Sequence, residues 1–134
     1  MTEEIRDRVN FRMKKASDTL DAARLLIGTG DFISAVNRIY YAVFYAVSAV
    51  LLSRGLSSSK HSGIISLFNK EIVNHGLVDK NFGRFFNQLF FERQEGDYGD
   101  FTEFDSTEVR SWLELADQFI ADMRRLIESD QPKG

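Results

Sequence analysis

The chain has 134 residues, enough for one domain with a hydrophobic core and too few to predict two. It contains no cysteine, which excludes disulfides, thiol catalysis and cysteine-based zinc or iron–sulfur sites. The 17 basic and 20 acidic residues give a net charge of −3, which argues against a broad electrostatic surface for nucleic acid, so no general DNA binding is expected. We therefore expect one domain over residues 1–134.

The N-terminal segment is charged from its third residue and lacks the apolar core of a signal peptide. The longest apolar segment carries Asn37 and Arg38, which is unusual for a membrane span. These features predict a cytoplasmic protein with no membrane association. A single proline and few segments of strand period predict helices throughout.

Apolar residues recur every three or four positions between Glu3 and Ile27, which predicts a first amphipathic helix. The Gly28-Thr29-Gly30 segment should end this helix, and Asp31 is a suitable N-cap for the next one. Because the connection is short, we expect the two helices to pack antiparallel.

The segment from Asp31 to Arg54 is predicted to be the central helix, because apolar residues cover most of its circumference and must be enclosed by other helices. Its polar members fall within an arc of roughly 100° and form a polar stripe: Ser34, Asn37, Arg38, Tyr41, Tyr45 and Ser48. Unpaired buried polar groups cost about 1–3 kcal/mol each, so the stripe should face a wet cleft, a partner subunit or a polar network. Alternatively, Arg38 and the two tyrosines extend along the edge of the bundle to solvent.

A serine-rich turn follows, in which Ser58 or Ser59 can cap a third helix from about Lys60 to Val73. Lys60 and His61 would lie in its first turn, where the helix dipole disfavours a cationic histidine. His61 would then be neutral and available as an acceptor or base. A surface or capping histidine is the alternative.

A fourth helix is predicted from Lys80 to about Glu95, capped by Asp79. Its inner face carries a mostly aromatic row that is expected in the core rather than at a cofactor: Phe82, Phe85, Phe86, Leu89 and Phe90. Arg93 precedes Asp97 by four residues, so the two side chains share a face if the helix persists that far.

An acidic run follows and lacks the spacing of a known metal-binding loop: Glu95, Asp97, Asp100, Glu103 and Asp105. A solvated loop is expected there, so we expect no metal and no cofactor. Asp105 and Glu108 resemble a capping box that opens the last helix, and the tail from Ser129 is expected to fray. Periodicity alone thus predicts an all-α, antiparallel up-and-down bundle of four to five helices.

Three motifs occur in order along the chain: AVNRIYYAVFYAVSAVLL, KHSGII and RQEGDY. Together they resemble the HEPN family (higher eukaryote and prokaryote nucleotide-binding), most closely its small stand-alone prokaryotic branch. The resemblance covers nearly the whole chain and implies an antiparallel helical bundle that forms homodimers with a polar cleft at the interface. Many members are metal-independent ribonucleases, and many are paired with a minimal nucleotidyltransferase in toxin–antitoxin systems. The resemblance therefore implies RNA or a nucleotide, and such a protein, as partners.

The family's active motif combines an arginine, which would hold the scissile phosphate, with a histidine about four to six residues later, which would take the proton of the ribose 2′-hydroxyl. The chain departs from this motif: by resemblance, Arg93, Asp97 and Tyr98 match the subgroup's Arg-x-x-x-Asp-Tyr element, but no histidine follows Arg93 there. His61 matches the subgroup's histidine before Ser-Gly. Arg54 and His61 have a similar spacing, which carries little information. If His61 folds back towards Arg93, an Arg–His pair forms from two segments.

In the first functional hypothesis, the chain is a module that engages nucleotide or RNA through catalytic residues Arg93, His61 and Asp97. Its ligand-binding residues would be Arg38, Tyr41, Tyr45, Tyr98 and Lys60. Alternatively, Arg93 and Asp97 form only a structural ion pair that fixes the fourth helix. In the second hypothesis, the protein is a non-catalytic helical dimer that acts as an adaptor or antitoxin-like binding partner, with the polar stripe and the acidic run as its interface. A metal-dependent enzyme that uses the acidic run is a distant third.

Overall fold

The computed structural model describes residues 1–129, and these contain helices and no strand. The elements are α1 (Glu3–Thr29), α2 (Phe32–Ser53), α3 (His61–Phe68), a π-helical turn η1 (Asn69–Val73), α4 (Lys80–Tyr98) and α5 (Ser106–Ser129). The predicted all-α fold of four to five helices is confirmed. The tail was predicted to fray from Ser129, but Ser129 is the last residue of α5; the rest of that prediction concerns residues 130–134, which lie outside the described part of the chain.

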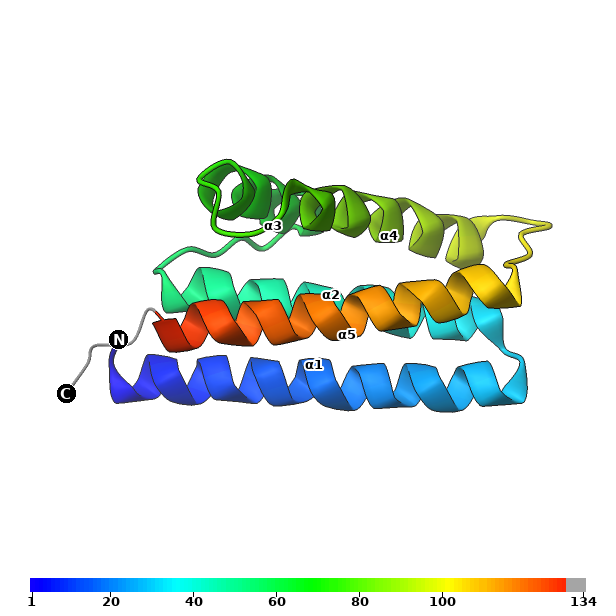
Figure 1. Ribbon diagram of the computed structural model, residues 1–134, viewed down its shortest axis with the longest axis horizontal. Helices are drawn as coiled ribbons and strands as arrows, with labels where there is room; N and C mark the ends of the chain where they lie inside the picture. Colours follow the sequence, from blue (N-terminus) through cyan, green and yellow to red (C-terminus); the bar gives the residue numbers. More distant parts are fainter. Residues whose placement is uncertain (130–134) are drawn as a thin grey trace.

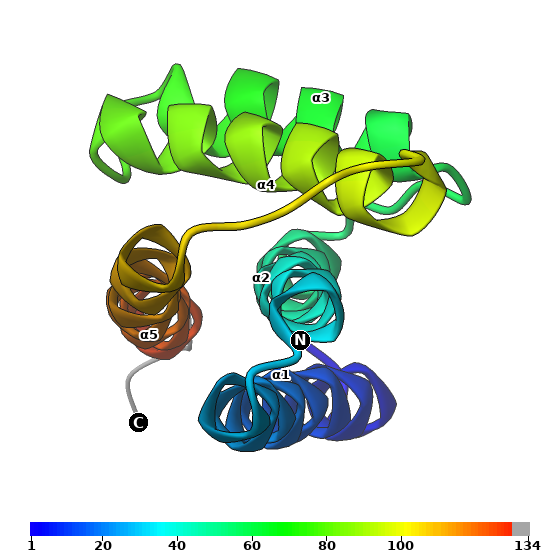
Figure 2. The ribbon, with the colours of Figure 1, turned by 90° about the vertical axis from the view of Figure 1, so that its right-hand side faces the viewer.

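The long helices α1, α2 and α5 run side by side, and α3 and α4 lie across one side of this group (Figures 1 and 2). Along the chain, α1, α2, α4 and α5 alternate in direction, as an up-and-down bundle requires (Figure 1). The layer of α3 and α4 is inclined to the axes of the other three helices (Figure 2). Residues from α2, α3 and α4 therefore meet where this inclined layer crosses α2.

Helix α2 is the central helix of the protein, as its sequence predicts. It packs against α1, α3, α4 and α5, and it carries a long series of fully enclosed side chains: Ala35, Val36, Ile39, Tyr40, Ala42, Val43, Ala46, Val47, Ala49, Val50 and Leu51. The helix is long and apolar enough to cross a membrane, but most of it is buried among the other helices. This burial is typical of the core helix of a bundle.

Side chains at the predicted N-caps define the starts of three helices. The carboxylates of Asp31, Asp79 and Asp105 accept hydrogen bonds from the backbone N–H groups of the residues that follow, at 3.1, 2.8 and 3.1 Å. Gly30 ends α1 with a φ of 82°, a left-handed conformation that glycine adopts without steric cost. The connection from α1 to α2 is as short as predicted.

The third helix differs from its prediction at both ends. The α-helix begins at His61, and Lys60 occupies the N-cap position without a capping side chain. Ser58 does not cap the helix; its Oγ accepts a hydrogen bond from the N–H of Lys60, one residue before the helical backbone begins. After Phe68 the backbone widens into η1, a π-helical turn that side-chain periodicity does not reveal.

Helix α4 continues to Tyr98, three residues beyond the predicted end at Glu95. Gly96, the residue after the predicted end, is helical and lets another segment approach. A Cβ at Gly96 would lie 3.0 Å from the ring of Phe104, which packs over this turn of α4. The added helical turn keeps Arg93 and Asp97 on one face.

Candidate functional site

Arg93 is the one charged side chain among the buried residues of the described chain, with 8% of its surface exposed. It lies on the inner face of α4, one helical turn before Asp97. Its Nη1 lies 3.6 Å from Oδ2 of Asp97, whose side chain is 25% exposed. The ion pair therefore sits at the boundary between the core and solvent, with the arginine on the inner side.

Aromatic rings surround the guanidinium of Arg93. Its Cζ lies 4.9 Å from the ring centroid of Tyr40, 5.6 Å from that of Tyr41 and 5.7 Å from that of Phe90. Its Nε is buried and has no hydrogen-bond partner in the described structure. A buried donor without a partner is costly, so Arg93 brings a positive charge into the protein that Asp97 compensates only in part.

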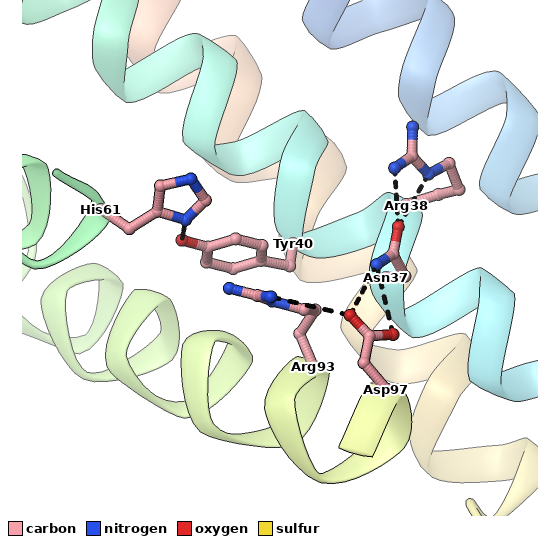
Figure 3. Close-up of polar contacts among 6 residues, drawn as sticks. All are labelled: Asn37, Arg38, Tyr40, His61, Arg93 and Asp97. Atoms are coloured by element: carbon pink, nitrogen blue, oxygen red, sulfur yellow. Dashed lines mark hydrogen bonds and ion pairs between the residues drawn. The ribbon is translucent and has the colours of Figure 1, made fainter. Parts of the chain in front are cut away.

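Tyr40 links Arg93 to His61. Its hydroxyl lies 3.0 Å from Nδ1 of His61, the first residue of α3, while the guanidinium of Arg93 lies over its ring (Figure 3). The imidazole of His61 also stacks on Phe44, with ring centroids 4.5 Å apart. Three helices thus place a histidine and an arginine around one buried tyrosine of α2.

The environment sets the protonation of these groups. Burial raises the pKa of Tyr40 to about 12, an effect that the charge of Arg93 opposes in part. Partial burial, followed by the positive charge of Arg93, lowers the pKa of His61 below the ordinary 6.5. At neutral pH Tyr40 is therefore an intact phenol, and His61 is a neutral imidazole that can accept a proton.

A second branch of polar contacts extends from Asp97 towards solvent. The carboxylate of Asp97 accepts hydrogen bonds from Nδ2 of Asn37 at 3.0 and 3.3 Å. Oδ1 of Asn37 accepts in turn from Nε and Nη2 of Arg38, at 3.0 and 2.7 Å (Figure 3). The guanidinium of Arg38 lies 5.2 Å from the ring centroid of Tyr41. We call the whole set the polar cluster: Asn37, Arg38, Tyr40, Tyr41, His61, Arg93 and Asp97.

The polar stripe of the central helix divides between two surroundings. Asn37, Arg38 and Tyr41 join the polar cluster against α4. Tyr45 and Ser48 face α1, where Nζ of Lys15 lies 4.6 Å from the ring centroid of Tyr45 and Nη1 of Arg12 donates to Oγ of Ser48 at 2.7 Å. The polar stripe therefore joins the polar cluster at one end and contacts cationic side chains of α1 at the other.

The structure brings the predicted catalytic residues Arg93, His61 and Asp97 into the polar cluster, together with Arg38 and Tyr41 of the predicted ligand-binding set. Tyr45 continues the row beyond Tyr41, with ring centroids 6.0 Å apart. The other predicted residues lie at the surface: Tyr98 is 78% exposed at the end of α4, Lys60 precedes α3, and Arg54 is the C-terminal cap of α2.

The acidic run does not act as one group. Asp97 points into the polar cluster and Asp105 caps α5, whereas Asp100 and Glu103 are exposed in the connecting loop. Over residues 1–129, no three histidine, aspartate or glutamate side chains gather as they would around a metal ion.

Residues 9–126 match the family model of the HEPN domain, which covers most of the chain. The chain belongs to the HEPN domain family. The UPF0332 protein of Thermotoga maritima is 46% identical to it over 120 residues, which cover 90% of this chain and 91% of that protein. The family predicted from the three sequence motifs is thereby confirmed.

Two relatives of this HEPN domain carry the name "putative toxin", and both come from Methanocaldococcus jannaschii. One is 32% identical over 98 residues, which cover 73% of each chain. The other is 31% identical over 123 residues, which cover 91% of this chain and 84% of that protein. A toxin–antitoxin context for the HEPN domain is consistent with these names.

The fold of the HEPN domain also occurs in a solved structure. The crystal structure of TT1696 from Thermus thermophilus superimposes with a TM-score of 0.74 and covers 89% of this chain and 98% of that one. Sequence identity is 19%, so this comparison concerns the fold alone.

Sequence reasoning missed two members of the polar cluster. No role for Tyr40 is predicted from the sequence, and Asn37 is placed in the polar stripe but not among the site residues. A signal for Tyr40 existed, because the hydroxyl of a buried tyrosine needs a hydrogen-bond partner. The partner could not be named from the sequence, since His61 reaches it only through the turn between α2 and α3.

Proposed function

We propose that this HEPN domain is the toxin of a toxin–antitoxin pair and acts as an endoribonuclease that needs no metal ion. The observation that carries the proposal is the neutral His61 held beside the buried charge of Arg93, with Tyr40 between them. The names of the two relatives from Methanocaldococcus jannaschii support the toxin role. The predicted cytoplasmic location agrees with an RNA substrate.

In this proposal His61 is the base that starts the reaction. Tyr40 engages Nδ1, so Nε2 is the nitrogen that meets the substrate. When the Nδ1–H of His61 donates to the oxygen of Tyr40, Nε2 is free to take the proton of a ribose 2′-hydroxyl. The 2′-oxygen then attacks the adjacent phosphorus, the bond to the 5′-oxygen breaks, and the products are a 2′,3′-cyclic phosphate and a 5′-hydroxyl. The proton on His61 passes to the leaving 5′-oxygen.

The two arginines supply positive charge from different depths. Arg38 is partly exposed and can contact a phosphate oxygen of the substrate directly. Arg93 is more deeply buried than Arg38 and stabilises the negative charge that develops on the phosphate. Tyr41 lies edge-on to His61, with ring centroids 5.7 Å apart, and offers a face on which a base can stack. Asp97 orients Arg93 and, through Asn37, Arg38.

The test is cleavage of a single-stranded RNA in excess chelator, with DNA of the same sequence as the control substrate. Wild-type protein should produce RNA fragments with cyclic phosphate ends and leave the DNA intact. Arg38→Ala should slow cleavage by about 10-fold or more. Arg84→Ala is the matched control, because Arg84 is exposed on α4 and its side chain hydrogen-bonds to Asn81 in the same helix, outside the polar cluster. Intact RNA at high protein concentration would contradict the proposal.

The second candidate function is that of a non-catalytic binding partner, and the loop after α4 favours it. Tyr98, the last residue of α4, and Phe101 in this loop are 78% and 96% exposed, near Asp100 and Glu103 in sequence. Exposed aromatic side chains flanked by carboxylates suit a partner with a basic surface, such as a minimal nucleotidyltransferase or, in a homodimer, the basic part of a second copy. If this function is correct, Phe101→Ala weakens co-purification with a nucleotidyltransferase encoded beside the gene, and RNA is left intact.

A further inference from the structure

A groove of about 610 Å³ lies between α1 and α2, on the edge of α1 that faces away from α5. The opposite edge of α1 is covered, since Arg124 of α5 donates to Ser17 and Arg24 pairs with Asp117 at 2.9 Å. Figure 2 shows α5 on one side of the pair formed by α1 and α2. The groove is therefore an open surface in the described structure.

Aromatic side chains form the apolar part of the groove. Phe11 of α1 is 67% exposed, an unusual position for a large apolar side chain. Phe44 and Tyr45 of α2 line the same groove. Three ring faces from two helices thus border one hollow, and Phe11 has most of its ring available to a ligand.

Cations are interleaved with these rings. Arg8, Arg12 and Lys15 line the groove with two carboxylates, those of Glu4 and Asp7, so the lining carries three positive and two negative charges in a chain of net charge −3. Glu4 is paired with Arg8 at 3.1 Å. Burial and the neighbouring Arg8 lower the pKa of Arg12.

Two of these cations are positioned by α2 and form no ion pair in the described structure. Nη1 of Arg12 donates to the carbonyl oxygen and to Oγ of Ser48, at 3.3 and 2.7 Å. Lys15 lies over the ring of Tyr45. Positioned cations beside one exposed and two partly exposed rings form a combination that can bind single-stranded nucleic acid, since cations contact phosphates and rings stack on bases.

The groove is continuous with the polar cluster. Phe44 lines the groove, and its ring also stacks on the imidazole of His61. Tyr45 of the groove stands next to Tyr41 of the polar cluster. A strand that leaves the phosphate at His61 can therefore follow α2 into the groove without crossing another helix.

We infer that the groove between α1 and α2 binds the single-stranded RNA that flanks the scissile phosphate, with a base stacked on Phe11 and Tyr45 and a phosphate held by Arg12 and Lys15. The inference rests on the proposed ribonuclease function and adds to it a binding site for the RNA on one side of the cleaved bond. An unpaired strand is required, because the bases must present their faces to the rings. The enzyme therefore binds an extended strand more tightly than a dinucleotide.

The test is binding and cleavage with two substrates, a dinucleotide and a single-stranded RNA of about eight nucleotides, within the usual span of such sites. Binding is measured by fluorescence anisotropy with a labelled, 2′-deoxy-substituted strand that cannot be cleaved by 2′-hydroxyl attack. Phe11→Ala and Lys15→Ala should each weaken binding of the long strand by roughly 10-fold and leave the dinucleotide unaffected. Matched controls are Phe91→Ala, which removes a 58% exposed ring from α4, and Lys70→Ala in η1.

The outcomes separate this inference from the proposed function. Binding that depends on Phe11 and Lys15 without any cleavage supports the groove and rejects the ribonuclease. Cleavage that is equally fast on both substrates and unchanged in both groove variants rejects the groove and keeps the ribonuclease. If Phe11→Ala instead converts a dimer into a monomer in sedimentation and leaves RNA binding unchanged, a second copy covers the groove and the inference is wrong.

Discussion

The hydroxyl of Tyr40 lies 3.0 Å from Nδ1 of His61, although 21 residues separate the two in the chain. Tyr40 is fully buried in α2 and holds the first residue of α3 against the helix bundle. The same tyrosine ring lies beneath the guanidinium of Arg93. Tyr40 therefore positions both groups of the Arg–His pair, one through its hydroxyl and one through its ring.

Tyr40→Phe tests this positioning role, because it removes the hydroxyl and keeps the ring. The free energy of unfolding should fall by about 1 kcal/mol, the typical net contribution of one hydrogen bond. The rate of RNA cleavage at saturating RNA should fall, whereas RNA affinity stays unchanged, since the hydroxyl orients His61 and does not touch the substrate. Single-turnover cleavage across a range of pH measures this. A purely structural role for Tyr40 predicts no change in the pH profile of the remaining activity.

Asp97→Asn tests the compensation of the buried charge of Arg93. The amide can still accept a hydrogen bond from Asn37, but it no longer balances the guanidinium. We expect the free energy of unfolding to fall by about 1–2 kcal/mol, between the values for exposed and fully buried pairs, because Asp97 is 25% exposed. Urea denaturation measures the change.

The control for this variant is Asp18→Asn, which removes the carboxylate of an ion pair with Lys14 in which both side chains are largely exposed. No measurable loss of stability is expected there, since solvent screens that pair. Equal losses in the two variants would show that the Arg93–Asp97 pair has no special role.

The lowered pKa of His61 predicts how stability depends on pH. Its pKa in the folded protein lies below the ordinary 6.5, so the unfolded chain binds the proton more readily. The contribution of His61 to the free energy of unfolding is therefore fully present above pH 6.5. It is lost as the pH falls from 6.5 through the pKa that His61 has in the folded protein. Denaturation of wild type and His61→Gln at several pH values isolates this effect, because other titrating groups such as Glu92 are common to both proteins. If the free energies of unfolding of wild type and His61→Gln differ by the same amount at every pH, the prediction is wrong.

Phe119 couples the two helical layers and should be critical for stability. Its ring on α5 meets Phe82, Phe85 and Phe86 of α4 and Phe68 of α3. Phe119→Ala should lower the free energy of unfolding by about 3–5 kcal/mol, through lost burial and the cavity that remains. Thermal denaturation compared with Phe91→Ala, whose ring is exposed, measures the effect. Similar stability of the two variants would mean that the layers do not depend on this contact.

Periodicity and caps were sufficient to predict the helices, because burial repeats regularly along each one and Asp31, Asp79 and Asp105 mark their starts. The helix predictions were wrong where contacts with another segment override a local sequence preference. Gly96 is normally read as a helix stop, but here it makes room for Phe104, which comes from a later segment. The π-helical turn after Phe68 is likewise not marked by any residue pattern.

Most residues of the site could be predicted from the sequence, but their arrangement in space could not. The motifs identified Arg93, Asp97 and His61, and the polar stripe identified Arg38 and Tyr41. Their convergence depends on the inclination of α3 and α4 across α2, which no local pattern encodes. Tyr40 was missed for the same reason, since its hydroxyl gains a role only when α3 is placed over it.

The most direct test of the central claim is the single-turnover rate of RNA cleavage by His61→Ala in excess chelator, with His75→Ala as the matched control. His75 is the other histidine of the chain and lies exposed between η1 and α4. Loss of a general base should slow cleavage by about 10²–10⁴-fold in His61→Ala, whereas His75→Ala should cleave at the wild-type rate. Equal rates in wild type and His61→Ala would contradict a reaction that starts at this histidine.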